Sequence, residues 1–420
     1  MLKKKRTVWF AAVLSIVMLF SVLGTGTTVA AEEEEPVMLE SDDAELDMPV
    51  GDAAVVPRQG GFVELSDEEL EEAERSVRDY KGTGKSLLVN KAKHFYYYEQ
   101  LTEDEQYIYD AMLQVVYDPV NSGFISGAML YMDPNSPEFR STANKVYYAM
   151  LYDHPELFWL YNTKDYYIYW SGRETAVPGL YSICFGLNKA YEEYEKEVKA
   201  FNKAVKKFLK KIDLKAGKKK IARQIHDELL KTVTYDYNVL DNMTEERYNR
   251  AHTAYGALVA NSQGEKHTAV CDGYAQAYVY LMQQAGCEAV VIMGEAGSPG
   301  NTGGHAWNMA SLKGKWYEID VTWDDLDRAD EITNKNDQPF YKYVKEAMKD
   351  DEYMKLRHHY MYCITTKQIS DFHTSEKYRY YTKDGKYWIS LIGDSVHIRD
   401  SELNRFAASK AIMELAPIAE

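Results

Sequence analysis

Three residues within one 50-residue block have side chains suited to nucleophilic chemistry. Cys271 stands at the start of a helical pattern, His305 begins a strand-like run, and Asp320 lies in the next strand-like run. In such a set the thiol attacks a carbonyl carbon, the imidazole moves the proton, and the carboxylate orients the imidazole. The order Cys, His, Asp, on a helix followed by strands, predicts acyl transfer through a thioester.

The helix that begins at Cys271 is predicted from one apolar face. That face is formed by Ala275, Tyr278, Val279, Met282 and Ala285, and Gly286 is placed to end the helix. The amino end of a helix favours a thiolate, so we expect an activated sulfur. A lone cysteine is more often a packed thiol. The presence of His305 and Asp320 favours the catalytic interpretation.

A hairpin is expected to bring His305 and Asp320 together. The runs His305–Leu312 and Trp316–Trp323 flank a short turn. If that turn has two residues, His305 faces Thr322, and Asp320 lies diagonally next to His305 on the same face. Such diagonal neighbours are about 7–8 Å apart. A shift of one residue would place them on opposite faces.

The elements before the hairpin follow from simpler patterns. The apolar run Glu288–Met293 predicts a strand, and the glycine-rich segment Gly294–Gly304 predicts a loop. Further upstream, Thr102 with Glu105 three residues on predicts a capped helix start. Together these patterns indicate an α+β protein.

Three motifs resemble the core of the transglutaminase-like superfamily. They are Val270-Cys271-Asp272-Gly273-Tyr274-Ala275, Gly304-His305-Ala306-Trp307-Asn308 and Trp316-Tyr317-Glu318-Ile319-Asp320-Val321-Thr322-Trp323-Asp324. Upstream segments resemble the lead-in of the secreted bacterial members: His226-Asp227, Tyr235-Asp236 and Thr253-Ala254-Tyr255-Gly256-Ala257-Leu258. The close similarity covers residues 220–325.

The resemblance implies a papain-like core in which a nucleophile-bearing helix packs on an antiparallel sheet. It assigns Cys271 as nucleophile, His305 as base and acid, and Asp320 as the orienting carboxylate. Animal transglutaminases have Gly-Gln-Cys-Trp where this chain has Ala269-Val270-Cys271-Asp272. That departure argues against cross-linking. Hydrolysis is favoured over transamidation because nothing in the sequence identifies an amine site.

Four further residues are candidates for the oxyanion site or for the walls of the cleft. The backbone N–H of the nucleophile is one expected oxyanion donor. A second could come from Tyr255 or Gln263, for which core packing and a loop position are the respective alternatives. Trp307 and Trp323 are expected to wall the site.

The amino-terminal 79 residues predict two segments outside the folded part. Residues 1–31 combine a basic start, an apolar run and small residues before Ala31, the pattern of a secretory signal peptide; an uncleaved anchor is the alternative. Residues 32–79 hold 18 acidic residues against three arginines, which predicts a disordered linker. We therefore expect the mature protein to be secreted, or to lie on the outer face of the membrane.

The remaining chain divides by composition into three parts. Residues 80–187 form a tyrosine-rich α+β module, residues 188–375 the catalytic domain, and residues 376–420 a hairpin and helix extension. The lysine-rich stretch within 189–231 is expected to be a solvated helix face. These are predictions of organisation, not of activity.

The cysteines, charge and motifs exclude several classes of function. Four cysteines in 420 residues exclude a disulfide-rich mini-protein, although one bridge from Cys184 or Cys287 to Cys363 stays open. A net charge of −16 argues against nucleic-acid binding. The acidic residues after Trp323 are expected to form a solvated loop rather than a calcium site. No cofactor or metal is expected.

The sequence thus predicts a secreted Cys-His-Asp thiol enzyme that cleaves or transfers acyl groups of peptide or glutamine-type amides. Its partner would be a protein or peptide, with cell-wall or cell-surface material as a further option. Membrane contact would come only through an uncleaved signal segment. The alternative is a non-catalytic transglutaminase-like binding module at the cell surface.

Overall fold

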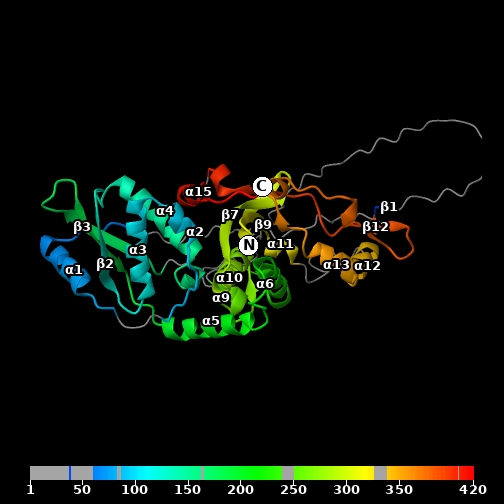
Figure 1. The fold of residues 1–420 in the computed structure, drawn as a ribbon, viewed down its shortest axis with the longest axis horizontal. Helices are drawn as coiled ribbons and strands as arrows, with labels where there is room; N and C mark the ends of the chain where they lie inside the picture. Colours follow the sequence, from blue (N-terminus) through cyan, green and yellow to red (C-terminus); the bar gives the residue numbers. More distant parts are fainter. Residues whose placement is uncertain are drawn as a thin grey trace, which may run out of the picture.

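The computed structural model describes residues 37–38, 60–82, 87–161, 165–238, 250–325, 338–404 and 406–420. The expected signal peptide and most of the acidic segment lie outside these residues. The described elements run from a helix-and-sheet module, through a central sheet, to a small hairpin region at the other end (Figure 1). No described helix is long and apolar enough to cross a membrane.

The amino-terminal module is built on a three-stranded antiparallel sheet of order β2-β4-β3, with β2 at Gly123–Leu130, β3 at Ile168–Glu174 and β4 at Tyr181–Leu187. Its helices are α1 (Asp67–Asp79), α2 (Tyr96–Gln100), α3 (Glu103–Tyr117), α4 (Pro137–Asp153) and the short η1 (Pro155–Leu157). The capping box predicted at Thr102 is confirmed, since its side chain accepts from the backbone N–H of Glu105.

The expectation of disorder up to residue 79 is wrong for α1. Ser66 and Glu69 form a capping box at its start, which satisfies free N–H groups of the first turn. Leu70 and Ala73 are buried, and Glu74 forms an ion pair with Arg173 of β3 at 2.6 Å. The acidic composition of this segment suggested disorder, but an amphipathic helix needs only a few apolar residues on its buried face.

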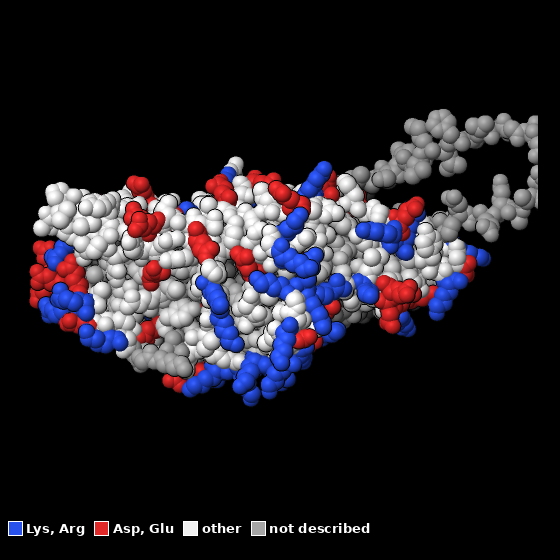
Figure 2. Space-filling model, viewed as in Figure 1, with Lys and Arg blue, Asp and Glu red and all other residues white. Residues whose placement is uncertain are grey.

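Two helices and a short parallel pair of strands lead to the central sheet. They are α5 (Tyr194–Leu209), α6 (Lys218–Thr232), β5 (Thr234–Tyr235) and β6 (Thr268–Ala269), with α9 (Ala254–Leu258) between the strands in the chain. Figure 2 shows basic side chains gathered on the face where Figure 1 places α5 and α6. The lysines of α5 point away from its buried apolar side, as the solvated-face interpretation predicts.

The central sheet has five antiparallel strands in the order β10-β9-β8-β7-β13. They are β7 (Glu288–Ser298), β8 (Asn301–Leu312), β9 (Lys315–Ile319), β10 (Tyr362–Ile364) and β13 (Val396–Arg399). Helix α10 (Cys271–Gln284) packs against β7 and β8. The predicted architecture, a helix that begins at Cys271 and packs on an antiparallel sheet, is confirmed.

The predicted hairpin register is confirmed over the length of β9. Leu312 pairs with Lys315, and Asn308 pairs with Ile319. The strand ends there, because the side chain of Asp320 caps α11 (Val321–Asp324) by accepting from the backbone N–H of Trp323. The expected pairing of His305 with Thr322 is therefore wrong.

The expected glycine-rich loop over 294–304 is a second departure. Strands β7 and β8 pair through this region up to a tight turn between Ser298 and Asn301. Gly294 is required because the backbone of β13 lies very close to it, not because the chain forms a loop there. A Cβ on Gly294 would lie 2.0 Å from the carbonyl oxygen of Ile398 in β13. Glycine here lets the edge strand dock.

The carboxy-terminal segment completes the sheet and adds a hairpin. The predicted hairpin forms from β11 (Tyr380–Tyr381) and β12 (Tyr387–Ile389), and β1 (Val37–Met38) pairs with β12. The other elements are α12 (Gln338–Ala347), α13 (Asp351–Arg357), α14 (Thr366–Ser370), η3 (Glu376–Tyr378), η4 (Asp400–Glu402) and α15 (Ala407–Met413). Because β13 belongs to the central sheet, the expected domain boundary at residue 375 is wrong.

Candidate active site

Cys271 is the first residue of α10, and local packing holds it there. The backbone N–H of the preceding Val270 donates to the carbonyl of Ala251 at 3.0 Å. A Cβ on Gly273 would lie 2.3 Å from that same carbonyl oxygen, so only glycine permits this contact. The Cys-Asp-Gly motif therefore fixes the start of the helix against residues 251–253.

The thiol is fully enclosed, and this changes its chemistry. Burial raises the pKa of Cys271 well above the ordinary thiol range, and the neighbouring Asp272 carboxylate raises it further. Hydrogen bonding from the backbone N–H of Ala306 acts in the opposite direction. The expectation of a thiolate favoured by the helix is wrong in this enclosed state, because desolvation outweighs the helix terminus. The sulfur lies against the residue that follows His305.

Asp272 is a site residue that the sequence did not identify. Its carboxylate contacts Nδ1 of His252 at 2.8 Å and accepts from the hydroxyl of Tyr161 at 3.4 Å. All three side chains are buried. A buried carboxylate next to the nucleophile keeps the resting sulfur protonated, because a second negative charge is costly there.

His305 and Asp320 form a buried pair with the geometry of an oriented imidazole. Nε2 of His305 lies 2.7 Å from Oδ2 of Asp320, and both side chains are fully buried. Nδ1 of His305 makes no hydrogen bond to any described residue. Asn308 secures the strand against the helix, since its amide donates to the carbonyl of Ala275 at 2.9 Å. The structure thus brings the three predicted residues together where the start of α10 meets β8 and the end of β9.

His397 in β13 contacts the same carboxylate and was missed by the sequence analysis. Its Nε2 lies 3.0 Å from Oδ2 of Asp320. The histidine pair lowers the pKa of Asp320 despite its burial, with His305 the largest favourable cause, and the N–H of Trp323 donates to its other oxygen at 3.0 Å. Burial lowers the pKa of His397. No local motif marks His397, which lies 77 residues from Asp320 in the chain.

Both predicted wall tryptophans lie beside the imidazole. The ring of Trp307 stacks with that of His305 at 6.1 Å between centroids, and the ring of Trp323 lies at 5.6 Å. Trp307 donates from Nε1 to Glu318 at 2.9 Å, and Glu318 is in turn paired with Arg399 of β13. These contacts fix the aromatic groups around His305.

The two candidates for a second oxyanion donor do not lie at the site. Tyr255 packs against Phe158 at 4.7 Å between centroids, and Gln263 lies on an exposed loop. Tyr235 of β5 is a better candidate. Its hydroxyl is buried without a hydrogen-bond partner among the described residues. Burial, followed by the nearby Cys271, raises the pKa of Tyr235.

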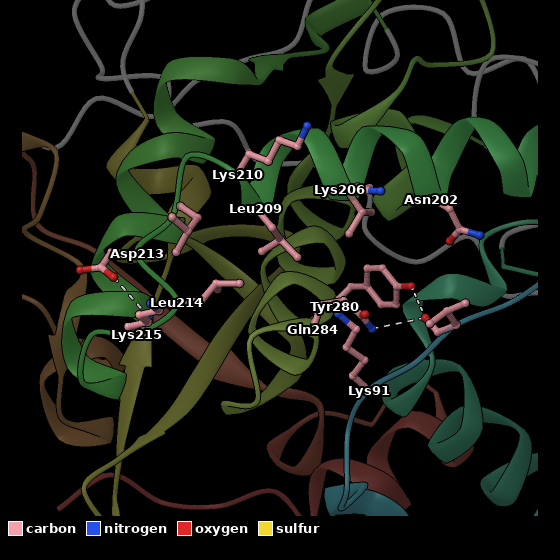
Figure 3. A pocket seen from close by; sticks show the side chains of 13 residues that line it. Lys91, Asn202, Lys206, Leu209, Lys210, Asp213, Leu214, Lys215, Tyr280 and Gln284 are labelled. Atoms are coloured by element: carbon pink, nitrogen blue, oxygen red, sulfur yellow. Dashed lines mark hydrogen bonds between the residues drawn. The ribbon is translucent and has the colours of Figure 1, made fainter.

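A separate cavity of about 690 Å³ opens between α5 and the far end of α10 (Figure 3). Tyr280 and Gln284 line it, and both side chains bond the carbonyl of Val89. Tyr280 is nine residues along α10 from Cys271, which corresponds to roughly 14 Å of helix. This cavity is therefore not the pocket of the thiol.

All four cysteines are free, so the bridge left open for Cys363 does not form. Burial raises the pKa of Cys184 and of Cys363 to about 11 and raises that of Cys287 as well.

Comparison with known proteins identifies the central region. Residues 206–321 match the family model described as the transglutaminase-like superfamily. A crystal structure of a TGase is 14% identical with a TM-score of 0.25, covering 42% of this chain and 57% of that one. A candidate cysteine protease from Cytophaga hutchinsonii is 12% identical with a TM-score of 0.21, covering 38% and 65%. The chain thus spans less than two thirds of either structure. The curated proteins contain no match.

The family match falls on the segment that carries α10 and the β7–β9 strands. It includes Cys271, His305 and Asp320, at the positions where the sequence motifs predicted the resemblance. Its helix and sheet have the predicted mixed arrangement. Residues 206–321 are therefore a transglutaminase-like region of this chain.

Proposed function

We propose that this chain is a cysteine acyl-transfer enzyme acting on peptide or glutamine-type amides. The observation that carries the proposal is the state of His305. One ring nitrogen is fixed by Asp320, and the other has no hydrogen-bond partner among the described residues, on a strand whose next residue contacts Cys271. An imidazole held in this way can accept a proton from a neighbouring thiol.

The reaction begins from a neutral thiol and a neutral imidazole. The Cys271 proton passes to Nδ1 of His305 as the sulfur bonds to the substrate carbonyl carbon. The resulting oxyanion is stabilised by the backbone N–H of Cys271 and the hydroxyl of Tyr235. His305 then gives the proton to the leaving nitrogen, and the C–N bond breaks to leave a thioester.

Water or an amine completes the turnover. His305 takes a proton from the incoming nucleophile, the carbonyl carbon is attacked, and the C–S bond breaks with return of the proton to sulfur. Asp320 stabilises the imidazolium in both halves. We favour water, because the described site presents no feature that would select an amine. A substrate reaches Cys271 only when the groups that enclose the sulfur move.

The proposed setting is outside the cell. Support comes from the basic and apolar pattern of residues 1–31 and the acidic stretch that follows. A peptide or protein is the proposed substrate, with cell-surface material as a further option.

The test compares the chain from residue 32 with its Cys271→Ala and His305→Gln variants. Each is incubated with casein, glutamine-containing peptides and a labelled primary amine, and the products are analysed by mass spectrometry. New peptide termini or deamidation that require both residues support hydrolysis, and amine incorporation supports transamidation. Turnover that persists in Cys271→Ala would overturn the proposal.

A second candidate is a non-catalytic binding module, which the enclosed, protonated state of Cys271 favours. It predicts no turnover of any of these substrates. It also predicts that alkylation of Cys271 by iodoacetamide is unchanged by His305→Gln. An enzyme predicts slower alkylation in that variant, because the imidazole helps to remove the thiol proton.

A further inference from the structure

A second group of two histidines and one aspartate lies outside the triad; we call His226, Asp227 and His359 the α6 cluster. Nδ1 of His226 lies 3.0 Å from Oδ1 of Asp227, and Nε2 of His359 lies 2.7 Å from the same oxygen. The potential ligand atoms of all three residues lie within 4.8 Å of one another. His226 is buried, and the side chains of Asp227 and His359 are 34% and 15% exposed.

Every ring nitrogen of the two histidines faces an oxygen. Nε2 of His226 lies 3.0 Å from Oδ2 of Asp324, and Nδ1 of His359 lies 2.5 Å from the carbonyl oxygen of Lys355. A neutral imidazole carries only one N–H. Hydrogen bonds alone therefore require both rings to be doubly protonated, with ring centroids only 5.2 Å apart.

Oδ1 of Asp227 would also be overcrowded by donors. Besides the two imidazoles, Nε of Arg223 donates to it at 2.9 Å. A carboxylate oxygen has about two lone-pair positions, so three donors on one atom exceed its capacity. One divalent cation would supply the same charge in place of the two protons that point at Asp227.

With a cation bound, each ring needs only one proton, on the nitrogen that faces away from Asp227. His226 then donates from Nε2 to Asp324, and His359 donates from Nδ1 to the carbonyl of Lys355. Metal-bound histidines characteristically donate their other N–H to a carboxylate or a backbone carbonyl. Ligands at about 2.0–2.1 Å from zinc in tetrahedral geometry are separated by roughly 3.3 Å. The two ring nitrogens lie 3.0 and 2.7 Å from Oδ1 of Asp227, so they would move away from that oxygen by only about 0.3–0.6 Å to accept an ion.

A cavity adjoins the cluster and leaves room for a further ligand. Its volume is about 490 Å³, and its lining includes Asp227, His359, His358 and Asp351. Two imidazoles and a carboxylate form a nitrogen and oxygen ligand set suited to zinc, with an open fourth position for water. We propose that His226, Asp227 and His359 bind one zinc ion.

The zinc would connect α6 to the segment that carries the triad carboxylate. Asp324, the partner of His226, also accepts from the backbone N–H of Met361 at 2.9 Å. The carbonyl of Met361 accepts in turn from the backbone N–H of Asp320 at 3.1 Å. We therefore assign the ion a stabilising role near the triad, and this assignment does not depend on the proposed activity.

The test uses the untagged full chain, treated with a chelator, desalted and then titrated with zinc chloride. We expect one zinc per chain to remain after gel filtration, measured by elemental analysis. Bound zinc should raise the melting temperature by about 5 °C at a free concentration roughly 100-fold above the dissociation constant. Absence of retained zinc in the folded protein would overturn the proposal.

Variants locate the ion. His359→Gln and Asp227→Asn should lose the retained zinc, whereas the control His373→Gln should keep it. His373 also lies between two carboxylates, Asp371 and Asp394, but it is well exposed. Two substitutions at the cluster keep the test decisive if one variant fails to fold.

Two further variants separate alternatives. Asp324→Asn should weaken zinc affinity about 10–100-fold, because it changes the outer partner of His226. Retention of zinc in both cluster variants would contradict the proposal. Loss of zinc in His397→Gln, but not in His359→Gln, would assign the ion to the triad instead and would also contradict it.

Discussion

The described residues include two groups of two histidines and one aspartate, and these groups differ in how the second nitrogen of each ring is used. In the triad group, His305 and His397 each place Nε2 on Asp320 and leave Nδ1 without a hydrogen bond to the described residues. In the α6 cluster, both nitrogens of each ring face oxygen atoms. The triad group is buried, and the α6 cluster adjoins a cavity.

The comparison shows why identical residue types can serve different chemistry. A ring with one unpartnered nitrogen can accept a proton from a nearby thiol, as His305 would from Cys271. A ring whose two nitrogens both face oxygen atoms has no nitrogen directed at a thiol, but it is well oriented for a metal ion. The role of a histidine is therefore decided by the partner of its second nitrogen.

The largest expected effect separates the two groups by activity. His305→Gln should lower kcat about 10⁶-fold, since the residues of a triad act as a unit and loss of the histidine removes proton transfer. His359→Gln, in metal-free protein at a temperature where both are folded, should change kcat less than about threefold. Steady-state kinetics on the substrate found with casein or the peptides measures both. Equal losses of kcat in the two variants would contradict the assignment of different roles to the triad group and the α6 cluster.

The next effect concerns the oxyanion donor. Tyr235→Phe should lower kcat about 10²–10³-fold, the usual cost of losing one such donor. Tyr278→Phe is the matched control, because its hydroxyl is also buried without a hydrogen-bond partner among the described residues. Tyr278 lies further along α10, and its pKa is raised by burial and by groups other than the triad. Similar losses in both variants would argue against a role for Tyr235.

A smaller effect is expected at His397, which we regard as a positioning residue. His397→Ala removes one of two imidazole contacts to Asp320, so kcat should fall about 10-fold while KM stays the same. His397→Gln should restore most of the activity, because its amide can donate to the same oxygen. A rise in KM without a change in kcat would instead indicate contact with substrate.

A last effect, on stability rather than on activity, extends the comparison to a buried aspartate whose hydrogen bonds come from backbone N–H groups and a phenol rather than from imidazoles. Burial raises the pKa of Asp153 to about 6, although the neighbouring His154 and hydrogen bonds from Tyr97, Tyr98 and Tyr109 act to lower it. Between pH 4 and 6 the folded chain therefore holds a proton that the unfolded chain has lost. The free energy of unfolding should fall by roughly 3 kcal/mol as pH rises through this window.

Denaturant unfolding across pH measures this slope. Asp153→Asn should flatten the profile between pH 4 and 6. Asp320 acts in the opposite direction, because its lowered pKa stabilises the fold above about pH 4 and that stabilisation is lost in acid. An unchanged slope in Asp153→Asn would contradict the expectation for Asp153.

Local patterns were sufficient for the central helix and hairpin. The turn at Lys313-Gly314 set the pairing of Leu312 with Lys315, and that register brought His305 and Asp320 to one place. Local patterns gave wrong predictions at two places where the composition of a segment did not reveal how it packs. The acidic residues of α1 suggested disorder. The glycines that let β13 pack against β7 suggested a loop.

Residues that reach the site from distant segments could not be predicted from local patterns. His397 comes from the last strand of the sheet, Tyr235 from β5, and His359 reaches Asp227 across 132 residues. Spacing along the chain does not encode such contacts, because they depend on which edge a strand joins.

The sequence by itself determined the elements that carry Cys271, His305 and Asp320 and the spacing between them, because helix periodicity and hairpin register are local properties. Only the tertiary structure decided the electrostatic state of that set. Burial and Asp272 keep Cys271 protonated, and two histidines hold Asp320 ionised. Desolvation and charge pairing depend on every group packed around a side chain, so they arise only when the distant segments come together.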